Sequence, residues 1–289
     1  MTSDQRPAGP IAVLGTGLIG AGVARNLALN GFEVRAWNRS AAKVQALSDH
    51  GVIPFDDAQD AVRDARIIVT VLKDGPAVEE VMTAIAPALG NGMVWLQLST
   101  VGIEAITSLT SLATKWGLNF YDAPVLGTRQ PAEQGKLTVL ASGAKSGREV
   151  AQAVFDAIGQ RTLWVADTPG ASSRLKLALN AYVFVLTHGI AESLAIASAL
   201  GVDPHLVIDA LTGGPLDSGY LQSKGGAMLK GGFDASFTVN NGLKDAKLVA
   251  DALVGTGVRA DLAEAGLARF ERAASLGHGE KDIAATFLA

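Results

Sequence analysis

The feature that most constrains this chain is a glycine-rich turn between a short apolar run and a helical pattern. The apolar run IAVLG ends at Gly15, and Ala21–Asn30 has helical spacing directly after the turn. The spacing satisfies G-x-G-x-x-G, in which the glycines allow a tight turn, close approach of a pyrophosphate, and packing of helix on strand. The new helix also offers free N–H groups and a positive dipole end to an anion. The pattern predicts a dinucleotide site at Gly15, Gly17, Leu18, Ile19 and Gly20; the alternative is a glycine turn in an ordinary α/β protein.

Composition narrows the classes of partner. The 289 residues are enough for about two domains, each with its own core. A formal net charge of -4 gives no basic field for a polyanion, so we expect a small-molecule substrate and no nucleic acid. The absence of cysteine excludes disulfides, thiolate metal sites and a cysteine nucleophile. The four histidines lack ligand spacing, so no metal site is expected. The polar N-terminal segment MTSDQRPAGP does not have the order of a secretory signal, and a cytoplasmic location is expected.

The order of the apolar runs predicts two domains of different class. Up to residue 166, short β-rich runs alternate with helical patterns, which is typical of a mainly parallel, doubly wound α/β sheet. The expected strands are residues 11–15, 33–38, 66–72, 93–99, 119–125, 137–143 and 162–166. After Pro169-Gly170 the chain is rich in alanine and leucine with helical spacing. We therefore predict a cofactor-binding domain over residues 1–168 and an all-α domain over residues 169–289, beginning with a long interdomain helix.

The most apolar stretch of the sequence runs from Leu175 to Leu200. Lys176, Asn180, His188 and Glu192 interrupt it, and such residues are costly in lipid. We expect a long buried helix and no membrane.

The end of the second expected strand bears on the choice of cofactor. NAD enzymes usually carry an acidic residue there, which binds the ribose hydroxyl. This chain has Asn38, Arg39 and Ser40, followed by Lys43. A guanidinium can pair with a 2′-phosphate that a carboxylate would repel. The pattern favours NADP(H) over NAD(H), and the alternative is a solvent-facing arginine.

A lysine in the apolar stretch is the strongest candidate for chemistry. An unpaired ammonium among apolar residues is costly, so Lys176 should face a cavity or an ion pair. Asn180 follows one helical turn later, so the two side chains can converge on one bound molecule. A lysine near a nicotinamide can protonate a carbonyl oxygen during reduction or accept the alcohol proton in reverse. The alternative is a snorkelling surface lysine with an unrelated asparagine.

Several separated motifs together resemble the β-hydroxyacid dehydrogenase family, which includes 3-hydroxyisobutyrate dehydrogenase. They are GTGLIGAGVARNLALNGFEV, DAPVLGTRQPAEQGKLTVLASG, the segment Gly170–Asn180, Phe237 with Leu243-Lys244-Asp245, and Gly277-x-Gly279-x-x-Asp282. The resemblance covers nearly the full length. It implies a Rossmann domain, a helical dimerising domain and a homodimer or homotetramer. It also implies that Lys176 is the catalytic lysine and Asn180 the substrate-binding asparagine, and that Leu72, Lys73, Thr100 and Lys244 lie beside the cofactor.

Two departures from the family pattern concern the substrate. The family's substrate loop usually reads Asp-Ala-Pro-Val-Ser-Gly-Gly, whose serine and glycines hold a carboxylate, whereas this chain has Leu126, Gly127 and Thr128 at the last three positions. Leu126 removes the hydroxyl donor, although the amides of Gly127 and Thr128 remain and Arg129 could compensate. A larger or less polar substrate is equally consistent. Ser172 also replaces a usual glycine.

These observations predict hydride transfer between NADP(H) and a small β-hydroxy acid, its semialdehyde or a related carbonyl compound. Lys176 would be the general acid or base and Asn180 would orient the reacting group. Imine reduction or reductive amination is the nearest alternative, because those enzymes share this architecture; they usually carry another residue at the lysine position. A catalytically silent NADPH-binding module is the alternative from a different class.

Overall fold

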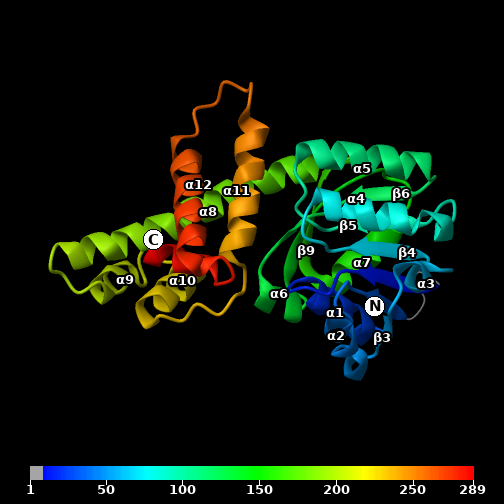
Figure 1. The fold of residues 1–289 in the computed structure, drawn as a ribbon, viewed down its shortest axis with the longest axis horizontal. Helices are drawn as coiled ribbons and strands as arrows, with labels where there is room; N and C mark the ends of the chain where they lie inside the picture. Colours follow the sequence, from blue (N-terminus) through cyan, green and yellow to red (C-terminus); the bar gives the residue numbers. More distant parts are fainter. Residues whose placement is uncertain (1–8) are drawn as a thin grey trace. The chain divides into compact units, whose positions relative to one another are not determined.

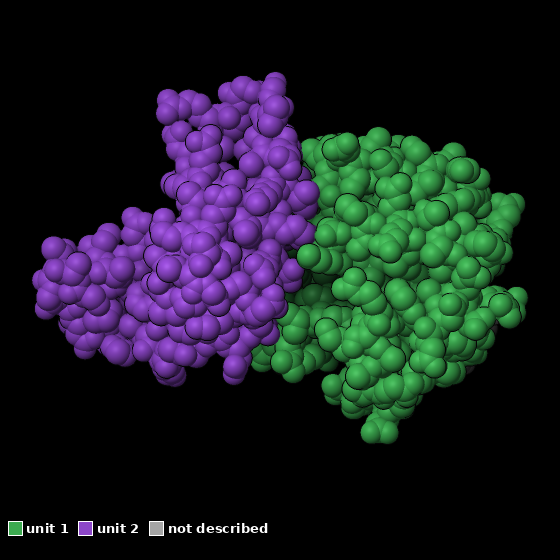
Figure 2. Space-filling model, viewed as in Figure 1, with its two compact units in different colours: residues 1–176 green, residues 177–289 purple. Residues whose placement is uncertain are grey.

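The computed structural model describes residues 9–289, and these form two compact units. The first unit extends to Lys176 and the second begins at Leu177; Figure 2 distinguishes them by colour. The first contains the whole β-sheet and the second is helical. The structure therefore has the predicted order, an α/β unit followed by an all-α unit.

The sheet of the first unit is doubly wound and mainly parallel. Within residues 9–289 it has nine strands in the order β3-β2-β1-β4-β5-β6-β8-β7, with β9 pairing with β8. The strands are β1 Ile11–Leu14, β2 Val34–Trp37, β3 Val52–Phe55, β4 Ile67–Thr70, β5 Val94–Gln97, β6 Asn119–Asp122, β7 Val125–Leu126, β8 Leu137–Ser142 and β9 Gly159–Ala166. The pairings β6-β8 and β7-β8 are antiparallel and the others are parallel. The first six strands have the order of a dinucleotide-binding sheet, whose switch point lies between β1 and β4.

Helices cover both faces of this sheet (Figure 1). They are α1 Gly20–Leu29, α2 Ala41–Gln45, α3 Ala58–Val62, α4 Gly75–Ala84, α5 Ile103–Lys115, α6 Arg129–Glu133 and α7 Arg148–Ile158, with short turns η1 Ser48–His50 and η2 Ala86–Ala88. Alternate residues of β1 point to opposite cores. Ile11 and Val13 pack with α1 and α7, whereas Ala12 and Leu14 pack with α4 and α5. Because both faces are buried, the strands are continuous apolar runs.

The sequence analysis missed β3 and predicted one strand over residues 119–125 where the structure has two, β6 and β7. β3 is four residues long, lies at the edge of the sheet and contains Pro54. Proline in a short run argues against a strand unless the run is at an edge, where the missing N–H is tolerated. The position of a strand within the sheet depends on the tertiary fold, so the local sequence pattern could not show that β3 lies at an edge.

The second unit is built from helices around two apolar clusters. It contains α8 Ala171–Ala199, which begins in the first unit, then α9 His205–Leu211, α10 Gly219–Lys230, α11 Val239–Leu253, α12 Asp261–Ala273, a π-helical turn η3 Ala274–His278 and η4 Ile283–Leu288. Phe184 of α8 and Phe270 of α12 meet edge to face, with ring centroids 5.0 Å apart. Lys224 forms a buried 2.6 Å ion pair with Asp282. That carboxylate also accepts hydrogen bonds from Ser236, Phe237 and Ala284. The C-terminal segment is thereby tied to α10.

Helix α8 is less buried than predicted. By length and composition it could cross a membrane, and only a third of its most apolar window is covered in the chain. Ala191 and Leu194 are fully buried on one face, whereas Tyr182 and Ile196 are 63% and 51% exposed on the other. The expectation of a buried helix is therefore correct for one face and wrong for the other.

The predicted domain boundary lies just before α8, whereas the compact first unit extends through Lys176. Polar contacts account for the difference. The N–H groups of Gly170 and Ser173 donate to Asp122 at the end of β6, and the Ser172 N–H donates to the hydroxyl of Ser142 on β8. The first turn of α8 is therefore hydrogen-bonded to the sheet.

Candidate functional site

The glycine turn connects β1 to α1 at the switch point of the sheet. A side chain on Gly15, whose φ is +103°, would overlap the carbonyl of Val71 after β4, and one on Gly20 would overlap the carbonyl of Gly15. A side chain on Gly17 would meet nothing within 4 Å. Two of the glycines are therefore required by the protein's own packing, while Gly17 leaves open space where the motif brings a pyrophosphate close to the backbone. Leu18 is exposed, and Ile19 is half-buried and packs against the core of the first unit. The turn fits a dinucleotide.

The residues after β2 divide into a structural and an exposed set. Asn38 accepts a hydrogen bond from the Thr16 N–H at 3.1 Å and donates to the Ser40 carbonyl at 3.3 Å. It therefore ties the glycine turn to the β2–α2 connection. Arg39, Ser40 and Lys43 are exposed beside it. Three potential phosphate donors thus stand at the edge of the turn.

The loops after β4 and β5 are joined by a serine. Ser99 Oγ accepts a hydrogen bond from the Leu72 N–H at 2.8 Å. Leu72 in turn lies against Gly15, where a β-carbon would approach its side chain to 2.9 Å. Lys73 is exposed and Thr100 half-buried in the same two loops. The structure therefore brings Leu72 to the glycine turn, as the cofactor role requires, and shows Ser99 to be the link between the loops.

The segment aligned with the family's substrate loop spans β7 and the start of α6. Leu126 is half-buried, Gly127 has φ +135°, and Thr128 precedes the helix. Arg129 forms a 2.8 Å ion pair with Glu133 one turn later. It also lines a cavity with Thr16 and the glycine turn, not with Leu126. The suggested compensation by Arg129 for the missing serine therefore has no support in these contacts.

Asp122 was not singled out from the sequence, yet it holds the start of α8. Its carboxylate is fully buried and accepts from the Gly170 N–H, the Ser173 N–H and the Ser173 hydroxyl at 3.1, 2.9 and 2.8 Å. The carboxylate thereby accepts from N–H groups at the start of α8, and such groups have no acceptor within the helix itself. Burial raises the pKa of Asp122 to about 6, and the hydrogen bonds from Ser173, Gly170 and Ser142 oppose that rise.

Lys176 and Asn180 are both buried on α8, 8% and 4% exposed. They are one helical turn apart, so their side chains project from similar directions of the helix. A lysine this buried is not a snorkelling surface residue. The structure therefore agrees with the apolar setting from which the chemistry of Lys176 was predicted.

A buried carboxylate on α11 connects two of the predicted residues. Asp245, 2% exposed, accepts a hydrogen bond from Asn180 Nδ2 at 2.9 Å and forms a 2.6 Å ion pair with Lys244. Because a carboxylate only accepts, Asn180 must turn its NH₂ group toward Asp245. Its carbonyl oxygen and second N–H remain for other partners. Asp245 thus fixes the orientation of Asn180.

Two family models match consecutive parts of the chain. Residues 10–166, more than half of the chain, match the model for the NAD binding domain of 6-phosphogluconate dehydrogenase. Residues 170–288 match the model described as NAD-binding of NADP-dependent 3-hydroxyisobutyrate dehydrogenase. The chain belongs to the β-hydroxyacid dehydrogenase family. Its first unit is thus the NAD(P)-binding domain of that family, and the protein is a hydroxyacid dehydrogenase-like oxidoreductase.

Individual members of the β-hydroxyacid dehydrogenase family resemble the chain along most of its length. Glyoxylate/succinic semialdehyde reductase 1 of Arabidopsis thaliana is 27% identical over 278 residues, covering 95% of this chain and 96% of that protein. The cytokine-like nuclear factor N-PAC of Danio rerio is 28% identical, and the match covers 96% of this chain but 61% of that protein. The crystal structure of 3-hydroxyisobutyrate dehydrogenase from Salmonella typhimurium superposes with a TM-score of 0.88 at 25% identity, covering 96% of this chain and 99% of that one.

Proposed function

We propose that the protein transfers hydride between NADP(H) and a small β-hydroxy acid, its semialdehyde or a related carbonyl compound. The observation that carries the proposal is the pair Lys176 and Asn180, buried one turn apart on α8, with Asn180 oriented by Asp245. Besides the hydride donor, carbonyl reduction needs a group that protonates the carbonyl oxygen; the buried ammonium suits this role, and the oriented carboxamide can position the substrate. The nicotinamide of a dinucleotide whose pyrophosphate binds at the glycine turn would supply or accept the hydride.

Each residue has a defined task in this proposal. Lys176 Nζ donates a proton to the carbonyl oxygen during reduction, and in the reverse direction it accepts the proton of the hydroxyl group. Asn180 keeps its carbonyl oxygen and one N–H for the substrate, because Asp245 occupies the other N–H. Their burial excludes water from the proton transfer, which strengthens the electrostatic interaction with the substrate oxygen.

The preference for NADP(H) is supported by the charges at the glycine turn. No acidic residue follows β2, where an NAD enzyme has its ribose-binding carboxylate. Asn38, Arg39 and Ser40 stand there instead, with Lys43 in the next helix. Arginine and lysine both suit a phosphate monoester.

The test is a screen of NADPH oxidation with semialdehydes, glyoxylate, β-keto compounds and cyclic imines. On the best substrate, Lys176→Met should lower kcat by about 10² or more, the scale of general acid-base catalysis, while the Kd for NADPH stays nearly unchanged. Lys115→Met, at an exposed position on α5, is the matched control and should be neutral. Turnover of Lys176→Met within a few-fold of the wild type would reject Lys176 as the proton donor.

A second candidate, imine reduction, is favoured by one residue. Leu126 stands where the family has a hydroxyl donor for a carboxylate, which suits a less acidic substrate. Solved imine reductases have this fold, with a TM-score of 0.65 at 20% identity for the Pseudomonas enzyme. Faster turnover of cyclic imines than of semialdehydes in the same screen would decide for this candidate.

A homodimer is supported by the uncovered face of α8. Tyr182, Gly189 and Ile196 recur every seven residues and are exposed, and Val185 lies between them, half-buried. A seven-residue apolar repeat on a helix is the pattern of a helix–helix seam. We infer that a second copy of the chain covers this face, and that the helix does not enter a membrane, because Lys176 and Asn180 lie within it.

A further inference from the structure

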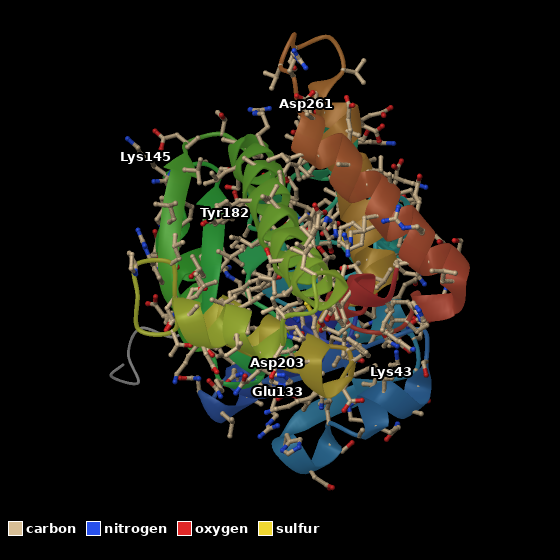
Figure 3. All side chains as sticks on the ribbon, turned by 90° about the vertical axis from the view of Figure 1, so that its left-hand side faces the viewer. Lys43, Glu133, Lys145, Tyr182, Asp203 and Asp261 are labelled. Carbon is tan, nitrogen blue, oxygen red and sulfur yellow. The ribbon has the colours of Figure 1, made fainter. Side chains whose placement is uncertain are left out.

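The last residues of four neighbouring strands form a buried polar row across the first unit. They are Thr70 of β4, Gln97 of β5, Asp122 of β6 and Ser142 of β8, and all four are fully buried. Neighbouring members of the row are register partners in the sheet. Lys145, labelled in Figure 3, follows the last member by three residues and marks where the chain leaves β8. Asp122 and Ser142 hold the start of α8, whereas Thr70 and Gln97 have no task in the site described so far.

Both ends of the Gln97 carboxamide are hydrogen-bonded. Its Oε1 accepts from the Ser99 N–H at 2.7 Å and from the Thr70 hydroxyl at 3.4 Å. Its Nε2 donates to the Ser99 carbonyl at 2.8 Å. The indole N–H of Trp95 donates to Thr70 Oγ1 at 3.0 Å and continues the network into the core. Because one side chain binds both the N–H and the C=O of Ser99, the loop after β5 begins in a fixed conformation.

The network reaches the glycine turn through the loop after β4. The N–H of Leu72 donates to Ser99 Oγ at 2.8 Å. This loop packs directly on the turn, because a β-carbon on Gly15 would overlap the carbonyl of Val71 and approach the side chain of Leu72. A displacement of Ser99 would therefore move the backbone that borders Gly15.

The loops after β4 and β5 lie in the half of the sheet that receives the nicotinamide nucleotide. A sheet of this strand order consists of two mononucleotide-binding halves, and the dinucleotide lies across the switch point between β1 and β4. The adenosine ribose is recognised at the end of β2, in the half that contains β1, β2 and β3. The nicotinamide nucleotide therefore belongs with β4 and β5.

Packing alone does not explain a carboxamide at position 97. Trp95 and Phe120 lie on the same face of the sheet, with ring centroids 4.6 Å apart in an apolar cluster. An apolar side chain would fill this space without the cost of removing a carboxamide from water, a cost that hydrogen bonds only offset. What the carboxamide of Gln97 adds is a fixed position for Ser99.

We propose that Gln97 is a positioning residue that holds the loops after β4 and β5 in the conformation that binds the nicotinamide half of the dinucleotide. Gln97 is fully buried, so it acts through Ser99 and Leu72 and not by contact with the cofactor. The inference rests on the dinucleotide binding of the proposed function. It is independent of the choice between NADP(H) and NAD(H) and of the chemistry of Lys176.

The experiment compares dinucleotides with fragments that lack the nicotinamide nucleotide. Calorimetry gives the dissociation constants of NADPH, 2′,5′-ADP, NADH and 5′-ADP for the wild type, Gln97→Met and Ser99→Ala. The ratio of the 2′,5′-ADP constant to the NADPH constant measures what the nicotinamide half adds to binding, and the ratio of 5′-ADP to NADH measures it without the 2′-phosphate.

Both ratios should fall in the variants. Gln97→Met keeps the length of the side chain and removes the two hydrogen bonds to Ser99, so each ratio should fall about tenfold or more. Ser99→Ala removes only the acceptor of the Leu72 N–H, so each ratio should fall about fivefold. The constants of the two fragments should change by less than about twofold, because the adenosine half binds at the other side of the switch point.

Val154→Ala is the matched control, because Val154 is fully buried on α7 in the apolar cluster on the other face of the sheet. It should lower the melting temperature and leave both ratios unchanged. Thermal unfolding of each variant measures the loss of stability, and a uniform loss of folded protein cancels from each ratio. If Gln97→Met does not fold, Ser99→Ala decides, since it removes a single hydroxyl group.

The outcomes separate the inference from the proposed function. Wild-type ratios in the variants that fold would reject the role of Gln97 and leave the proposed function in place. A wild type that binds the dinucleotides no more tightly than the fragments would reject both, because the nicotinamide half would then not be held. The ratios are measured without turnover, so a substrate screen that finds no activity would count against the proposed function alone.

Discussion

The carboxylate of Asp122 should make the stability of this protein fall as the pH rises from about 4 to 7. Burial raises the pKa of Asp122 to about 6 from the ordinary 3.8. The raised value means that the ionised form is the costly one in the folded state. Well below pH 4 the carboxyl is protonated in both states. Between pH 4 and 6 the folded state binds more protons than the unfolded state, so the free energy of unfolding decreases with pH.

The size of the effect follows from the same two values. At about 1.4 kcal/mol per pH unit, the interval from 3.8 to about 6 corresponds to about 3 kcal/mol in total, of which about 2 kcal/mol is lost between pH 4.5 and pH 8. Asp122→Asn removes the titrating group while keeping an oxygen that can accept from the Gly170 and Ser173 N–H groups. The stability of the variant relative to the wild type should therefore rise by about 2 kcal/mol between pH 4.5 and pH 8.

Urea unfolding, followed by tryptophan fluorescence at several pH values from 4.5 to 8, measures this difference. Other groups titrate in the same range, and comparing variant with wild type removes their contribution. Asp49→Asn, at an exposed position in the same unit, is the control. A stability difference between Asp122→Asn and the wild type that stays constant with pH would refute the desolvation argument.

Two further predictions concern the second unit. Asp245→Asn should lower kcat/KM by roughly 10- to 100-fold, because the carboxamide of Asn180 is no longer forced into one orientation. The magnitude follows from the loss of one charge-assisted hydrogen bond, which is worth about 1.5–3 kcal/mol. Steady-state kinetics measure this effect, and Asp251→Asn on the same helix is the control. Ile196→Glu should convert the proposed dimer to a monomer, because it places a charge on the exposed apolar face of α8. Light scattering tests this, and an unchanged mass would exclude α8 as the interface.

The fold was predictable because its signals are local. β1 and the glycine turn lie within ten residues, and the change to helical spacing after Pro169 marks the second unit. Edge strand β3 was missed because its position, not its sequence, permits Pro54. The exposed face of α8 was missed for a related reason. Apolar composition alone does not tell whether a helix is covered by its own chain or by another copy.

The predicted site residues were those that motifs mark, whereas the residues that hold them were not found. Asp122 acts on residues 48 and 51 positions away, and Asp245 on one 65 positions away. Such partners are brought together by the sheet and the helical unit, and a single sequence carries no record of the pairing. Ser99 was not predicted to have a role, although its position after β5 is what joins two cofactor loops.

The two buried carboxylates show why the same substitution should have different consequences at two positions. The donors that reach Asp122 are neutral N–H and O–H groups, so replacing its charge by an amide removes a desolvation cost and leaves no charge behind. Asp245 is paired at 2.6 Å with Lys244, whose side chain is 20% exposed, so the same replacement removes the carboxylate from an ion pair with a largely buried ammonium. Asp122→Asn should therefore be tolerated at neutral pH, while Asp245→Asn should lower both stability and activity. Equal stability losses at the two positions would contradict this argument, because they would mean that the charge of Lys244 makes no difference to the cost of losing the carboxylate.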